Sequence, residues 1–336
     1  MTPNVCTRFA ALIPALLVSL ASSHAFAQGA SGFPPGYPER PLRVIVTTVA
    51  GGGIDIITRP VMERLSQRLG KPILVENRSG ANGLIGTNFV VDAAADGTTL
   101  LSTGDSFVMN GVLKRFPYDV RQVFAPLAQL SVQDYLVFSH PALPVSNFRE
   151  LLDYARRNPG KLNFGSAGTG SVGHLGLELI KSKTGVSIVH IPYKGNAPAA
   201  LDLAAGQIQL LFSNIAGVQM VRSGKARVIG VMTPKRMPAY PDIPTVAESG
   251  VPGFELRNTY CLYVLAKTSP QIVSVSALNR EILQILTAPE IRERYAVDSS
   301  EVAPPHSPDE LRRLLNAEFE KWDAIARIAN IKADTP

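Results

Sequence analysis

Three glycine-rich turns contain the residues of this chain best suited to chemistry. They are Gly51-Gly52-Gly53, the turn at 103–106 and the turn at 166–171. Each follows a predicted strand and precedes a predicted helix. Glycine lets the backbone approach a ligand closely, and the amides at a helix start carry about half a positive charge. Such turns can bind a carboxylate or phosphate without a lysine, although any one of them can equally be a tight turn with no ligand.

Several turns must act together to hold a ligand. Each amide or dipole contributes only about 0.3 to 1 kcal/mol, whereas micromolar binding requires about 8 kcal/mol. The turn at 166–171 is the richest in small polar residues, and His174 follows on the next helical turn. Three turns facing one cleft would therefore form an anion site. His174 is either a ligand contact or a capping or buried structural histidine.

Enzyme motifs are incomplete around these turns. A nucleophile elbow requires glycine two residues before the serine, but Thr169 precedes Ser171 at that spacing. The dinucleotide fingerprint lacks its third glycine, because Ile56 stands there, and no Walker lysine follows a glycine turn. The histidines after residue 27 lack a histidine neighbour at metal-binding spacing. We expect no catalysis, metal or cofactor; the competing class is an exported serine hydrolase using Ser171 and His174.

The first 27 residues are typical of an export signal. Arg8 precedes an apolar run over 9–22, and Ala25-Phe26-Ala27 matches a signal peptidase site. The run is too short to span roughly 30 Å of hydrocarbon. We therefore expect cleavage after Ala27 and a soluble product in the periplasm, with an uncleaved membrane anchor as the alternative. Its single cysteine, Cys261, could not form an internal disulfide.

The length and charge of the chain indicate how many domains it has and which partners are disfavoured. The chain has 336 residues, a length typical of two domains that each bury a core. Lysine and arginine total 33 against 27 acidic residues, but basic residues cluster only in pairs such as Arg156-Arg157. A dispersed positive charge is typical of a solvated surface, so we expect no nucleic-acid partner.

Alternating apolar runs and amphipathic stretches predict two α/β units. The first unit has predicted strands at 42–46, 73–76 and 99–102, with helices at about 57–69 and 83–94. The second has predicted strands at 134–139, 162–166, 187–191, 208–212 and 226–232, with helices at 147–157, 172–184, 197–205 and 217–223. A late strand is predicted at 258–266, and the rest of the chain to 328 reads as helical except around Pro304-Pro305.

A late strand followed only by helices does not complete a third sheet. The chain is therefore predicted to leave the first lobe, build the second and return. The predicted lobes are 28–132 plus 258–336, and 133–257. The predicted fold is α/β, of the two-lobed periplasmic binding protein type (type II-like), with a mainly parallel sheet flanked by helices in each lobe and two crossover strands between them. Ligands of such folds lie in the crevice beyond the carboxyl ends of the strands.

Ordered stretches of sequence match one known family along nearly all of the expected mature chain. In the first lobe they are Tyr37-Pro38-Glu39-Arg40-Pro41, Gly51-Gly52-Gly53-Ile54-Asp55, 76–83, 96–101 and Pro117-Tyr118-Asp119. In the second lobe they are 160–164, Ser166-Ala167-Gly168-Thr169-Gly170, 190–195 and 241–250. On these residues the chain resembles the substrate-binding proteins of tripartite tricarboxylate transporters, the Bug family.

The resemblance implies a periplasmic protein that closes on a small organic carboxylate and delivers it to membrane permease subunits. A ligand sensor that presents the closed form to a receptor is the alternative, and we expect a monomer. The implied ligand contacts are Thr48, Gly52, Gly53, Asp55, Ser166, Ala167, Gly168 and Thr169, with Thr103, Asp105, Lys194 and Asn214 nearby. For three of these a structural role is an equal alternative: a helix cap for Asp55, a surface turn for Lys194 and a strand-end cap for Asn214.

Thr48-Val49-Ala50 stands where the family usually has proline and aromatic residues before the triple glycine, and three further positions depart from the family pattern. Ile54 stands where a small hydroxyl residue is usual, Asp105 where serine or threonine is usual, and Leu262 where glycine often occurs. Because Ile54 removes a hydroxyl and adds apolar volume, our hypothesis is a ligand with an apolar or aromatic body, or with fewer polar groups than citrate. Calorimetry with aromatic and aliphatic acids tests it, and tight citrate binding without aromatic binding would contradict it.

Overall fold

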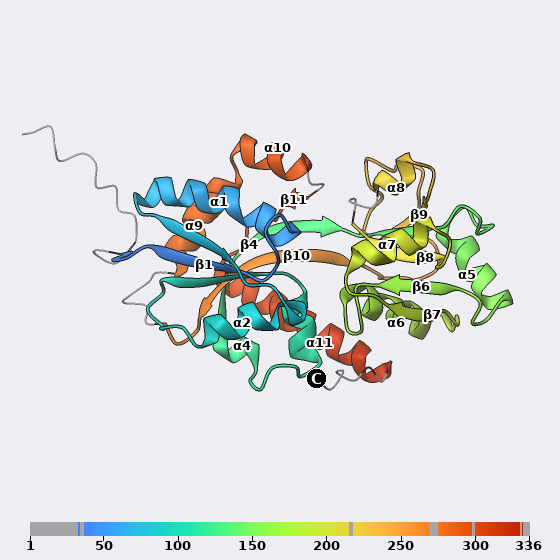
Figure 1. Ribbon diagram of the computed structural model, residues 1–336, viewed down its shortest axis with the longest axis horizontal. Helices are drawn as coiled ribbons and strands as arrows, with labels where there is room; N and C mark the ends of the chain where they lie inside the picture. Colours follow the sequence, from blue (N-terminus) through green and yellow to red (C-terminus); the bar gives the residue numbers. More distant parts are fainter. Residues whose placement is uncertain are drawn as a thin grey trace, which may run out of the picture.

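The computed structural model describes residue 33 and residues 37–214, 218–268, 275–297, 300–329 and 331. The predicted export signal, 1–27, lies outside the described residues. Two lobes lie side by side along the long axis of the molecule, and each is built on one sheet with helices packed against it (Figure 1). None of the described helices combines the length and apolar character needed to cross a bilayer.

The first sheet has the strand order β2-β1-β3-β10-β4-β11. Its strands are β1 (Leu42–Val46), β2 (Ile73–Asn77), β3 (Thr99–Thr103), β4 (Phe124–Asp134), β10 (Arg257–Leu265) and β11 (Glu301–Val302). The helices of this part of the chain are α1 (Gly53–Leu69), η1 (Ala81–Gly83), α2 (Leu84–Val91), α3 (Ser106–Val112), α4 (Val120–Val123), α9 (Val275–Leu286), α10 (Pro289–Val297) and α11 (Pro308–Ile328).

The second sheet has the strand order β7-β6-β8-β5-β9. Its strands are β5 (Leu136–Ser139), β6 (Asn163–Ser166), β7 (Val189–Pro192), β8 (Leu210–Ser213) and β9 (Arg227–Val231). The helices between them are α5 (Phe148–Arg157), α6 (Val172–Thr184), α7 (Asn196–Ala204) and α8 (Val218–Arg222).

Two predicted helix boundaries, the start of α5 and the end of α1, are confirmed, and a capping residue forms each of them. Asn147 caps α5 by accepting a hydrogen bond from the amide of Glu150, as the capping-box spacing predicts. Gly70 ends α1 in the left-handed conformation, with φ of 62°, which glycine adopts without steric cost.

Both sheets are mixed, so the prediction of mainly parallel sheets is wrong. Strands β1, β2 and β3 pair in parallel, whereas β10 runs antiparallel to β3 and β4. In the second sheet β6 is parallel to β7 and β8, but β5 is antiparallel to β8 and β9. In the first sheet, β4 and β10 are antiparallel because the chain leaves this lobe along β4 and returns to it along β10.

The hinge is the antiparallel pair β4 and β10, which crosses the middle of the molecule (Figure 1). The register pairs Arg257 with Asp134 at the end of β4, and an ion pair joins their side chains at 2.6 Å. Strand β10 falls on the predicted strand at 258–266, but most of β4 was not predicted. Strand β4 has eleven residues, and nine register pairs join it to β10.

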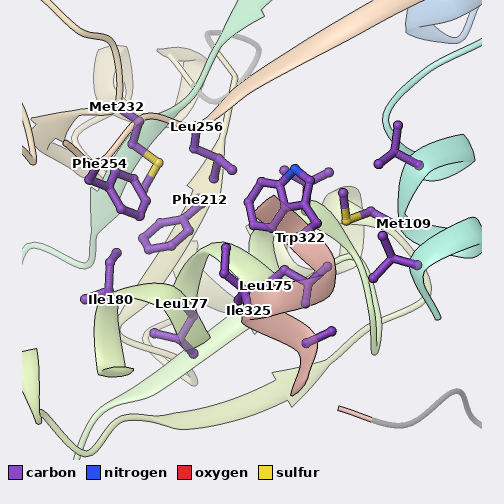
Figure 2. Packing of buried hydrophobic residues seen from close by; sticks show 14 of the residues in the cluster. Met109, Leu175, Leu177, Ile180, Phe212, Met232, Phe254, Leu256, Trp322 and Ile325 are labelled. Atoms are coloured by element: carbon purple, nitrogen blue, oxygen red, sulfur yellow. The ribbon is translucent and has the colours of Figure 1, made fainter. Parts of the chain in front are cut away.

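Helix α11 adds a third connection between the lobes. It packs against α3 and β4 of the first lobe and against α6 of the second. Trp322, which is 3% exposed, belongs to one buried cluster with Met109 of α3 and with Leu175, Phe212 and Leu256 on the second-lobe side (Figure 2). The two lobes therefore share a continuous apolar core beside the hinge.

Candidate functional site

A cavity of about 290 Å³ lies between the lobes. The first lobe lines it with Thr48, Gly53, Ile54, Asn82, Gly104, Asp105, Ser106 and Met109. The second lobe and the hinge contribute Tyr135, Ala167, Ser171, Val172, Gly173, Asn196, Phe212, Asn258 and Tyr260. Among these described residues there is no lysine or arginine. The lining is thus a mixture of neutral hydrogen-bonding groups and apolar side chains, with one carboxyl group.

Four of the thirteen sequence-predicted residues line this cavity: Thr48, Gly53, Asp105 and Ala167. Thr48 and Gly53 come from the turn after β1, Asp105 from the turn after β3, and Ala167 from the turn after β6. All three glycine-rich turns therefore reach one cavity. The other nine residues are not among the lining residues, and their positions are described below.

The first-lobe turn presents unused hydrogen-bond donors. Helix α1 begins at Gly53, and its N-cap, Gly52, provides no side-chain hydrogen bond. The first-turn amides of a helix lack partners inside the helix. Within the described part of the chain, the buried Oγ1 of Thr48 has no hydrogen-bond partner. A buried hydroxyl is normally paired, so Thr48 retains unused hydrogen-bonding capacity beside the cavity.

Asp55 supports this turn from behind. Its Oδ2 accepts from the Gly51 amide at 2.9 Å, and its Oδ1 accepts from Asn77 Nδ2 at 2.8 Å. Arg59 completes the cluster with an ion pair at 2.9 Å, and Asn77 also donates to the Thr48 carbonyl at 3.0 Å. Burial raises the pKa of Asp55, but the hydrogen bonds from Arg59, Gly51 and Asn77 outweigh it, so the pKa is below its usual value. The carboxylate is fully engaged in shaping the turn.

The second-lobe turn ends at the start of α6. Ser171 caps that helix by accepting from the His174 amide at 3.4 Å. Ser166 is 1% exposed, and its Oγ lies 3.1 Å from both the amide and the carbonyl of Gly168. Gly168 has a φ of 127°, a conformation that only glycine adopts readily. Ser166 and Gly168 therefore fix the shape that presents Ala167 to the cavity.

Two stacked histidines support this turn. The rings of His174 and His190 lie 3.8 Å apart and 9° from parallel. His190 Nε2 is 2.6 Å from Ser166 Oγ, and His174 Nδ1 accepts from the Gly170 amide at 3.0 Å. His174 therefore supports the turn through Nδ1, while its Nε2 lies 3.8 Å from Glu178 Oε1 on the same helix.

We expect acid to weaken this support through His190. Burial and the neighbouring His174 lower its pKa to about 4. The unfolded chain therefore takes up a proton first as the pH falls below 6.5, and stability drops by about 1–3 kcal/mol before pH 4 is reached. His190→Gln retains an amide for Ser166 but has no proton to gain. Urea unfolding at pH 7.5 and 4.5 should show a smaller loss in the variant; equal losses would contradict the assignment.

The remaining predicted residues have other positions. Thr103 is buried and its hydroxyl accepts from Thr47 Oγ1 at 3.1 Å, whereas Lys194 is exposed. The Thr169 carbonyl accepts from Arg115 Nη2 of the first lobe at 3.1 Å, which is a direct contact between lobes.

Asn214 contacts the hinge. Its Nδ2 donates to Gln133 Oε1 on β4 at 3.0 Å. The same oxygen accepts from the Tyr260 hydroxyl at 2.8 Å, so Gln133 ties the second lobe to β10. Tyr260 was not among the predicted residues, yet it lines the cavity.

A second cavity of about 350 Å³ lies between the hinge strands and α11. Thr103, Cys261 and Trp322 line it, and Gly104, Asp105 and Met109 line both cavities. Burial, with the nearby Asp105, raises the pKa of the Cys261 thiol to about 12, so Cys261 is a neutral thiol at physiological pH. Among the described residues there is no cluster of side chains that could hold a metal ion.

Comparison with known proteins identifies the family. Residues 57–331 match the family described as "Tripartite tricarboxylate transporter family receptor". The chain belongs to this receptor family. It is 31% identical to protein BugT of Bordetella pertussis over 300 residues, which cover 88% of this chain and 91% of that protein. The sequence-based resemblance to the Bug family is therefore confirmed.

Solved structures of related proteins contain carboxylates. One is Rpa4515 of Rhodopseudomonas palustris with adipate (32% identity, TM-score 0.76, covering 88% of this chain and 99% of that one). Another is MatC of the same organism with bound malate (28% identity, TM-score 0.73, covering 86% and 99%). These matches confirm the two-lobed periplasmic binding protein fold for this receptor.

Several lining residues of this receptor were not predicted. Asn82 has a positive φ of 53° and lies within the matching stretch 76–83, so that stretch could have nominated it. Asn196 follows the matching stretch 190–195. Tyr135, Asn258 and Tyr260 lie at the hinge, where strand periodicity alone does not distinguish a cavity wall from a buried face.

Gly53→Ala should weaken ligand binding by about tenfold or more, or ~1.4 kcal/mol. An added Cβ would lie 2.6 Å from the Tyr260 hydroxyl, forcing a cavity wall to move. Tyr260→Phe in the same chain removes that hydroxyl and should restore part of the affinity. Isothermal calorimetry on both variants and on Tyr260→Phe alone measures the coupling. Purely additive effects would mean that the contact does not control binding.

Proposed function

We propose that this receptor binds a small organic carboxylate between its lobes and delivers it to the membrane subunits of a tripartite tricarboxylate-type transporter. The observation that carries the proposal is a cavity bordered by the N-terminal ends of two helices, α1 and α6. Its described lining residues include neutral hydrogen-bond donors and no basic side chain. Helix starts favour anions. The adipate and malate in related structures support the same ligand class.

Delivery to a membrane partner implies export. The sequence features of residues 1–27 support transfer to the periplasm, and the family description as a transporter receptor supports a permease partner. Within the proposed cycle, a carboxylate accepts hydrogen bonds from the α1 start and the Thr48 hydroxyl, while the turn before α6 contacts it from the second lobe. Contacts from both lobes favour the closed form, because a ligand shifts the equilibrium only through differential affinity.

A binding screen tests the proposal. The purified protein is titrated by calorimetry with adipate, malate, citrate, benzoate and uncharged adipamide. We expect one carboxylate class to bind with a one-to-one stoichiometry and adipamide to bind at least about tenfold more weakly, or 1.4 kcal/mol. The test variant is Thr48→Val, which keeps the side-chain shape, removes the unpaired hydroxyl and should weaken carboxylate binding. Absence of carboxylate binding, or affinity unchanged in Thr48→Val, would contradict the proposed site.

A further inference from the structure

Asp105 is the one carboxyl group among the described residues that line the interlobe cavity. It stands between β3 and α3 and borders both cavities. Its Oδ1 accepts two hydrogen bonds from Thr259, one from the amide at 3.1 Å and one from Oγ1 at 2.6 Å. Within the described part of the chain, its Oδ2 accepts none. The residue is therefore held firmly on one side and retains an acceptor on the other.

The protein around Asp105 does not neutralise its charge. Tyr135 and Tyr260 on the hinge are uncharged neighbours. Glu318 and Lys321 of α11 lie across the second cavity, and they pair with each other at 2.8 Å. Thr259 donates only to Oδ1, and a carboxylate held inside a protein without a cationic partner is costly. A hydrogen-bond donor placed beside Asp105 would relieve this cost. A ligand bound in the interlobe cavity can supply that donor, because Asp105 lines this cavity.

We propose that Asp105 selects carboxylic acids that carry a hydrogen-bond donor, an ammonium or hydroxyl group, at the end distant from the bound carboxylate. The inference rests on the proposed function, because it assumes that a carboxylate binds at the α1 and α6 starts. A second carboxylate placed beside Asp105 would be repelled, whereas a donor would satisfy Oδ2. Asp105 thus discriminates amino and hydroxy monocarboxylates from dicarboxylates of equal length.

Ligand series that differ only at the far end test the inference. The six-carbon set is hexanoate, 6-hydroxyhexanoate, 6-aminohexanoate and adipate, and the four-carbon set is butyrate, 4-hydroxybutyrate, 4-aminobutyrate and succinate. Affinities are measured by calorimetry at pH 8. In the set whose length fits, the amino or hydroxy acid should bind at least about tenfold more tightly than the dicarboxylate, a difference of 1.4 kcal/mol.

Two substitutions and one control locate the effect. Asp105→Ser and Asp105→Asn should each lower the preference for the donor-bearing acid over the dicarboxylate by at least about tenfold. Asparagine keeps an acceptor for Thr259, so it separates the charge from the local fold. Glu318→Gln removes a carboxylate that lines only the second cavity, and it should leave the preference unchanged.

The outcomes separate this inference from the proposed function. If no member of either series, and none of the acids in the screen, binds the wild-type protein, the proposed function fails. If carboxylates bind but the dicarboxylate binds as tightly as its amino and hydroxy analogues, the inference fails while the function stands. A preference that persists in Asp105→Ser and Asp105→Asn also overturns it, because another residue would then be selecting the donor.

Discussion

Replacing Trp322 with alanine should lower the free energy of unfolding by about 3–5 kcal/mol, the range for removing a large buried aromatic side chain. Trp322 is 3% exposed, and it lies in the buried cluster that joins Met109 of the first lobe to Leu175 and Phe212 of the second (Figure 2). The deletion leaves a cavity at the point where α11 bridges the lobes. Surrounding side chains from two lobes cannot collapse into it together.

Trp322→Phe provides the control for this prediction. Phenylalanine keeps most of the apolar surface but loses the hydrogen bond from Nε1 to Glu318, which is 2.8 Å long. We expect it to cost less than half as much as alanine. Urea unfolding followed by far-ultraviolet circular dichroism measures both, because the chain has a single tryptophan and loses its intrinsic fluorescence probe. Equal costs for the two variants would mean that the hydrogen bond, not packing, stabilises this junction.

Asp105→Asn should stabilise the protein, and more so at high pH. Burial raises the pKa of Asp105 to about 7 from a usual value of 3.8. A carboxyl group whose pKa is raised by folding contributes most below pH 3.8, and stability is lost as the pH rises towards 7. Between these pH values Asp105 is ionised in the unfolded chain, whereas it stays mostly protonated in the folded protein. Asparagine does not ionise, so the variant should gain about 1–2 kcal/mol at pH 5 and about 3–4 kcal/mol at pH 8.

Unfolding in urea at these two pH values measures the effect. The side-chain carbonyl oxygen of the introduced asparagine can still accept both hydrogen bonds from Thr259, so the comparison isolates the charge. Asp242→Asn, at an exposed position, is the matched control and should change stability by less than about 0.5 kcal/mol at either pH. Loss of stability in Asp105→Asn at both pH values would show that the carboxylate already has a stabilising partner.

The strands and helices that the sequence predicts well are those whose signals are local. The apolar run at 42–46 becomes β1 with the same bounds, and helix α6 begins and ends where predicted. Strand β4 was mostly missed because no turn or alternation isolates it. It exists as a long strand because β10 returns from the second lobe and pairs with it over nine residues, a partner more than a hundred positions away.

In the candidate site, too, some features follow from local sequence and others depend on residues distant in the chain. Glycine turns at the ends of β1, β3 and β6 can be read from composition and order, and the structure brings residues of all three to one cavity. The role of Asp55 could not be read in this way. A carboxylate at a helix start is consistent with a ligand contact or a support, and only its contacts with Asn77, 22 positions away, identify the support.

The sequence by itself determined the family, the alternation of strands and helices, and the turns able to receive an anion, because glycine content, periodicity and helix starts are properties of neighbouring residues. Only the tertiary structure decided which of those turns carry unused donors, that α11 packs on both lobes, and that Asp105 is enclosed between two cavities. The physical reason is that desolvation and hydrogen-bond satisfaction depend on what surrounds a group in space. For Asp105 those surroundings come from the hinge and α11, segments distant in the chain.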